Sequence, residues 1–150
     1  MFFRSTAESF TMQAHPDVLV VEDDQDEQRI VRRALHQHGL DERVKIVGSG
    51  EEALEFLDRD RPHPPKVILL DLKLPGIDGH EVLRRIRADE ALRTVPVVIV
   101  SSTDSDSDIG QCYLLGANSF IPKRHDVGAP GGYVIEAAHY WLDLNRLSAG

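Results

Sequence analysis

The chain has 150 residues, of which 41% are hydrophobic and 28% charged, proportions that are ordinary for a single soluble globular domain. It carries 17 basic and 25 acidic residues, and the formal net charge of −8 argues against binding to nucleic acid or to an anionic membrane surface. No apolar run is long enough for a membrane span or a signal peptide, and the single cysteine, Cys112, has no partner for an internal disulfide. These features predict a cytoplasmic protein.

Along the chain, short β-branched runs alternate with amphipathic segments. Residues 1–16 lack a clear period and are predicted to form a flexible arm, which leaves residues 17–150 as one domain. The β-branched runs predict strands over 18–21, 44–47, 67–70, 95–100 and 119–121. The amphipathic segments predict helices over 27–38, from Ser49 through Leu57, and over 80–88, 108–115 and 132–147. Five successive strand–helix units predict an α/β fold, a doubly wound parallel sheet with helices on both faces.

In such a sheet, ligands bind beyond the carboxyl ends of the strands, so the residues at those ends are the first candidates for chemistry. The first strand is followed by Glu22, Asp23 and Asp24, and the third ends at Asp71. An acidic residue after a strand often caps the next helix, which is the favoured interpretation of Asp26 or Asp78 taken alone.

Capping does not explain three aspartates at one edge, because crowded carboxylates repel one another. For Asp23, Asp24 and Asp71 together, a divalent cation is the better explanation, and oxygen ligands favour a hard ion such as Mg²⁺. The fourth strand ends at Ser101 and the fifth near Lys123, which add a hydroxyl and a counter-charge. A carboxylate nucleophile, a metal ion and a cation make a site that accepts a phosphoryl group.

These residues resemble the receiver domains of bacterial two-component response regulators. The resemblance covers nearly everything after the arm and rests on residues 22–24 (EDD), 71–79 (DLKLPGIDG), 97–102 (VVIVSS) and 116–123 (GANSFIPK). It implies the flavodoxin-like receiver fold with strand order 2-1-3-4-5. It also implies a response regulator that accepts a phosphoryl group from a sensor histidine kinase and signals by protein–protein contact, without being an enzyme that acts on other substrates.

The resemblance assigns a role to each residue of the motifs. Asp71 would be the phosphoacceptor, and Mg²⁺ would be bound by Asp71, by Asp24, by Asp23 and by the backbone carbonyl of Lys73. Lys123 and Ser101 would contact the phosphoryl oxygens, and Ser101 and Phe120 would be the switch residues that move together on phosphorylation.

The sequence departs from the family pattern at three positions. Ser101 replaces the commoner threonine, and Phe120 lacks the phenolic oxygen that many members carry at that position. Arg124 stands where many receivers have a proline joined to the lysine by a cis bond, so we expect a differently built loop after Lys123.

A narrower resemblance is to the small stand-alone receivers that partner bacterial phytochrome histidine kinases. It rests on residues 91–96 (ALRTVP), 101–104 (SSTD), 112–118 (CYLLGAN) and 140–142 (YWL). It implies a bacteriophytochrome as the kinase and a homodimer through the last helix, with Tyr140 and Trp141 as dimer contacts. The alternative interpretation of that apolar helix is deep packing against the sheet.

Two other functions remain open at this stage. Phosphatases of the haloacid dehalogenase type also combine a carboxylate nucleophile with Mg²⁺, but they carry a second aspartate where this chain has Lys73. The other alternative is a receiver-like interaction module that is never phosphorylated.

Overall fold

The computed structural model describes residues 15–103, 105–123 and 128–147 and contains one five-stranded sheet. The strands pair in the order β2-β1-β3-β4-β5, and every pair is parallel. Their bounds are β1 Val18–Val21, β2 Val44–Val47, β3 Val67–Asp71, β4 Val97–Ser101 and β5 Ser119–Pro122. The flavodoxin-like order 2-1-3-4-5 is thus confirmed.

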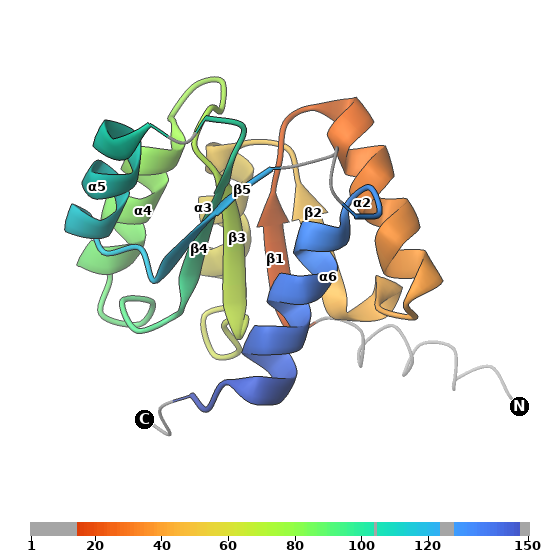
Figure 1. Cartoon of the computed structure of the whole chain (residues 1–150). Helices are drawn as coiled ribbons and strands as arrows, with labels where there is room; N and C mark the ends of the chain where they lie inside the picture. The colour runs from red at the N-terminus through yellow and green to blue at the C-terminus, as the bar shows by residue number, and fades with distance from the viewer. Residues whose placement is uncertain (1–14, 104, 124–127, 148–150) are drawn as a thin grey trace, which may run out of the picture.

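Two layers of helices cover the sheet (Figure 1). On one face, α3, α4 and α5 pack over one apolar cluster, and on the other face α2 and α6 pack over a second. The helix bounds are α2 Gln25–Gln37, α3 Gly50–Arg59, α4 Gly79–Ala88, α5 Asp106–Leu114 and α6 Gly132–His139, with a short 3₁₀ turn η1 at Asp41–Arg43.

The central strands are buried along their whole length because helices lie on both sides of them. Side chains of a strand alternate between the two faces, so Leu19 and Val21 join the first cluster while Val18 and Val20 join the second. The continuous β-branched runs in the sequence are the direct consequence of this double burial.

Side-chain caps set the starts of the helices. Asp24, Ser49, Asp78 and Ser105 are the N-cap residues of α2, α3, α4 and α5, and each accepts hydrogen bonds from backbone N–H groups of the first turn. Two predicted starts were therefore too late: α2 begins at Gln25 rather than at 27, and α5 begins at Asp106 rather than at 108.

The uniform helix predicted for residues 132–147 is wrong beyond His139. The chain continues as a π-helical turn, η2 (Tyr140–Leu144), which closes with a hydrogen bond from the Asn145 N–H to the Tyr140 carbonyl at 2.6 Å. This wider turn leaves Tyr140 48% and Leu144 60% exposed, while Trp141 packs against the second apolar cluster.

Some of the predictions concern residues outside the described part of the chain. These are residues 1–14 of the proposed arm, the loop position Arg124 and residues 148–150. Within the described residues, no helix has both the length and the apolar character needed to cross a bilayer.

Candidate functional site

The carboxyl ends of four parallel strands bring the predicted chemical residues to one edge of the sheet. Val21 pairs in register with Leu70, so Glu22, which follows β1, lies beside Asp71 at the end of β3. Ser101 ends β4 and pairs with Pro122 of β5, which places Lys123 one residue further along the same edge. The sheet topology therefore brings the carboxylates, the Ser101 hydroxyl and the Lys123 amine to the same edge.

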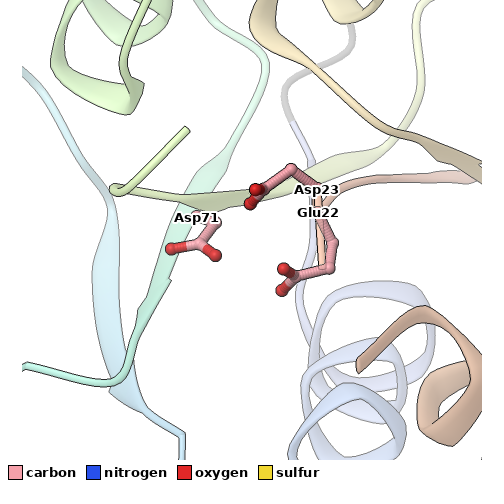
Figure 2. A group of neighbouring side chains, drawn as sticks. All are labelled: Glu22, Asp23 and Asp71. Carbon is pink, nitrogen blue, oxygen red and sulfur yellow. The ribbon is translucent and has the colours of Figure 1, made fainter. Parts of the chain in front are cut away.

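Three carboxylates from Glu22, Asp23 and Asp71 surround a common space at this edge (Figure 2). One oxygen from each lies within 4.8 Å of one from each of the others. Glu22 is 3% and Asp71 7% exposed, whereas Asp23 is open to solvent. An all-oxygen donor set of this size fits a hard divalent cation, since the ion offsets the repulsion between the carboxylates.

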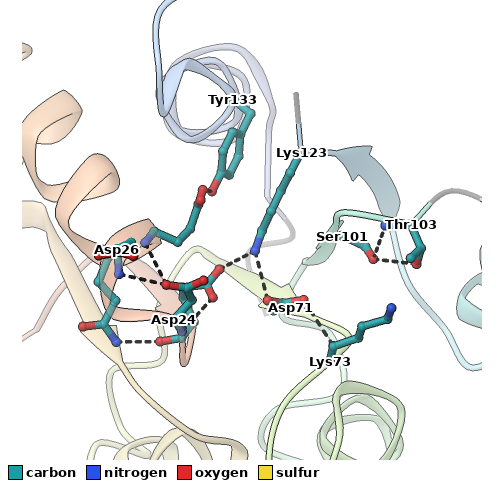
Figure 3. A network of polar contacts seen from close by, with 11 residues as sticks. Asp24, Asp26, Asp71, Lys73, Ser101, Thr103, Lys123 and Tyr133 are labelled. Atoms are coloured by element: carbon teal, nitrogen blue, oxygen red, sulfur yellow. Dashed lines mark hydrogen bonds and ion pairs between the residues drawn. The ribbon is translucent and has the colours of Figure 1, made fainter. Parts of the chain in front are cut away.

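The ammonium group of Lys123 forms ion pairs with two of these carboxylates, those of Glu22 and Asp71 (Figure 3). Its Nζ donates to Glu22 Oε1 at 2.5 Å and to Asp71 Oδ2 at 3.0 Å. Burial by itself would lower the pKa of Lys123, but its bond to Glu22 and the negative charges of Asp71 and Glu22 together raise it. Burial raises the pKa of Glu22 against the opposing effect of the same Lys123 bond. The ammonium thus stays charged between two carboxylates.

Asp24, predicted to bind the metal, is not part of the acidic group. Its Oδ1 accepts from the backbone N–H groups of Asp26 at 2.8 Å and Glu27 at 3.3 Å, so its carboxylate serves as the cap of α2. Glu22 takes its place in the group, and sequence reasoning missed it as a site residue. The available signal was position: Glu22 follows the buried strand immediately, whereas Asp24 directly precedes a helix.

The loop after β3 holds the Asp71 carboxylate in a defined orientation. The Lys73 N–H donates to Asp71 Oδ1 at 3.2 Å, which leaves Oδ2 to Lys123. Gly79, the first residue of α4, closes this loop by donating to the Leu72 carbonyl at 3.0 Å. A pocket of about 530 Å³ opens beside the loop, with Asp23, Lys73 and Thr103 among its lining residues.

The two predicted switch residues lie on neighbouring strands but have different surroundings. Ser101 is fully buried, and its Oγ accepts from the Thr103 N–H at 3.2 Å and lies 3.1 Å from Thr103 Oγ1. Phe120 is half-buried and packs against the first apolar cluster. Of the two switch residues, Ser101 therefore lies at the site.

The predicted dimer contacts, Tyr140 and Trp141, lie in a different element, the π-helical turn η2 that follows α6.

Comparison with known proteins agrees with this geometry. The family model for the response regulator receiver domain matches residues 18–129. The probable methanogenesis regulatory protein FilR2 of Methanothrix harundinacea is 36% identical over 135 residues, which span 86% of this chain and 85% of that protein. The response regulator Rcp1 of Synechocystis is 30% identical over 136 residues, which span 88% of this chain and 92% of Rcp1.

Solved structures of response regulators also resemble this chain in their fold. The phosphorylated cyanobacterial phytochrome response regulator RcpA superimposes with a TM-score of 0.79 at 32% identity, covering 90% of this chain and 99% of RcpA. The Mn²⁺-bound form of Rcp1 gives a TM-score of 0.75 at 29% identity, covering 89% of this chain and all of Rcp1 (100%). With the family match, the strand order and the acidic group in agreement, this chain belongs to the response regulator receiver domain family.

Proposed function

We propose that Asp71 accepts a phosphoryl group from the phosphohistidine of a sensor histidine kinase. The observation that carries this proposal is the setting of the Asp71 carboxylate: it is buried, paired with Lys123 at 3.0 Å and grouped with two further acids. A carboxylate in such a setting acts as a nucleophile when the charge on the incoming group is neutralised.

The residues of the chain divide the work between orientation and charge. The Lys73 N–H and the Lys123 ammonium each hold one oxygen of Asp71, which fixes the plane of the carboxylate. As the bond from a carboxylate oxygen to phosphorus forms, the phosphorus–nitrogen bond of the donor histidine breaks. Lys123 neutralises the phosphoryl oxygens, and Ser101 donates its hydroxyl to one of them after leaving Thr103.

The ion that fits this site is Mg²⁺, which would be held by Asp23, Asp71 and the backbone carbonyl of Lys73. Glu22, whose carboxylate belongs to the same acidic group, would add negative charge beside the ion while it stays paired with Lys123. When bound, the ion supplies positive charge to the phosphoryl oxygens. Asp24 is not in this ligand set because its carboxylate caps α2.

Intact mass after incubation with acetyl phosphate and Mg²⁺ tests the acceptor. The wild type should gain one phosphoryl group and Asp71→Asn none; a gain in both proteins would refute the assignment.

A matched pair of variants then tests which of the neighbouring acids, Asp23 or Asp24, binds Mg²⁺. Asp23→Asn should lose Mg²⁺-dependent phosphorylation, whereas Asp24→Asn should keep it because asparagine caps a helix as well as aspartate does. The reverse result would restore Asp24 as the ligand.

The names of the relatives support a phytochrome kinase as the partner, since RcpA and two bacteriophytochrome response regulators are among the similar structures. We further propose a homodimer through the last helical segment, where Tyr140 and Leu144 are exposed and Trp141 is half-buried. The location we propose is the cytoplasm, where the buried thiol of Cys112 stays reduced.

The family match favours the receiver function over a dehalogenase-type phosphatase. The acidic group with its paired Lys123 favours it over an interaction module that is never phosphorylated. We propose a signalling protein whose chemistry is confined to its own phosphorylation and dephosphorylation. Its signal would leave by contact with another protein, and the family match supports a histidine kinase as the donor.

A further inference from the structure

Tyr133 lies in the first turn of α6 and reaches across to α2. Its hydroxyl donates to the carboxylate of Glu27, which is only 8% exposed. Burial, the bond to Glu27 and the nearby charges of Glu22 and Asp71 all raise the pKa of Tyr133, so the phenol remains a protonated donor at physiological pH. A hydrogen bond to a buried carboxylate is among the stronger polar contacts in a protein.

Glu27 is bonded into the segment that carries the metal-binding acids. Its N–H donates to Asp24 Oδ1 at 3.3 Å, and the Asp24 N–H donates to Glu22 Oε2 at 3.0 Å. The Gln28 side chain donates to the Glu22 carbonyl at 2.6 Å. These bonds join residues 22–28 into one hydrogen-bonded unit that links Glu22 to Glu27.

The connection from β5 to α6 is attached to this unit at both ends. Lys123, just after β5, bonds to Glu22, and Tyr133, in the first turn of α6, bonds to Glu27 (Figure 3). The Tyr133 ring also lines a cavity together with Glu22 and Asp71, and that cavity measures only about 10 Å³. This is room for a single water at most, so little space separates Tyr133 from the two acids.

We propose that Tyr133, through its hydrogen bond to Glu27, couples the state of the phosphorylation site to the packing of α6. This inference rests on the proposed phosphorylation of Asp71. A phosphoryl group adds negative charge beside Lys123 and Glu22, and its contacts fix the acid-bearing segment. Fixing that segment fixes the Glu27 carboxylate, so Tyr133 and the first turn of α6 become more ordered. Tyr133 is thus a positioning residue, outside the reacting atoms.

Amide hydrogen exchange of peptides from α6 measures this coupling. Each protein is compared with and without acetyl phosphate and Mg²⁺, and phosphorylation is verified by intact mass. In the wild type we expect phosphorylation to slow exchange in α6 by about fivefold, the lower range of typical coupling between sites. The ratio is taken within each variant, so a uniform loss of stability does not imitate the effect.

Four variants separate the hydrogen bond from general packing. Tyr133→Phe and Glu27→Ala should each abolish the slowing, whereas Glu27→Gln should retain it because the amide oxygen still accepts from the phenol. Tyr113→Phe, at an exposed tyrosine of α5, is the control and should behave as the wild type. Slowing of wild-type size in phosphorylated Tyr133→Phe or Glu27→Ala would overturn the inference. No phosphorylation of the wild type would instead refute the proposed function.

Discussion

The substitution Gly79→Ala tests how tightly α4 is packed against the phosphoacceptor. A Cβ at Gly79 would lie 2.4 Å from the carbonyl oxygen of Asp71 and 2.7 Å from the Cα of Leu72. Both are backbone atoms, so no side-chain rotation relieves the clash. Because ordinary contacts of a Cβ begin at 3.4 Å, the two segments must separate by about 1 Å.

Two magnitudes follow from that separation. Overpacking of this kind destabilises a protein by about 1–3 kcal/mol. A displacement of ~1 Å at a reacting group lowers a rate by about 100-fold, and here the displaced group is the backbone of Asp71 itself. We therefore expect both a lower free energy of unfolding and much slower phosphorylation by acetyl phosphate.

Gly110→Ala is the matched control, because a Cβ at this position in α5 meets nothing within 4 Å. It should stabilise the protein by about 0.5–1 kcal/mol, since alanine restricts the unfolded chain and favours the helix. Urea denaturation gives both stabilities, and the time course of intact mass gives the phosphorylation rate. If Gly79→Ala matched the wild type in both measurements, the close packing of α4 on the Asp71 backbone would be disproved.

Two further predictions concern other parts of the fold. The bond from Arg61 lowers the pKa of Asp89, so the stabilisation from this carboxylate is present above its ordinary pKa of 3.8 and is lost as pH falls through the lowered value. The difference in melting temperature between wild type and Asp89→Asn should therefore disappear in strong acid; a constant difference would contradict this. Leu144→Lys, at a side chain that is 60% exposed, should convert a dimer to a monomer in light scattering. A monomeric wild type would end the dimer hypothesis.

The fold was predictable from the sequence because strands that are buried on both faces are apolar at successive positions. Runs such as Val18–Val21 are apolar at every position, as expected of a strand that is covered on both faces. The ends of those runs also locate the chemistry, since parallel strands present their carboxyl ends at one edge. Asp71, Ser101 and Lys123 were therefore placed correctly at that edge without any tertiary information.

The tertiary structure decided which acids of the run 22–24 face the site. Glu22 and Asp24 both offer a carboxylate, but the backbone N–H groups at the start of α2 attract that of Asp24, and Lys123 attracts that of Glu22. The contact between Glu27 and Tyr133 joins residues 106 positions apart, and no local pattern records it. Periodicity reports the burial that each element requires, whereas the partner of a polar side chain depends on which elements the fold brings together.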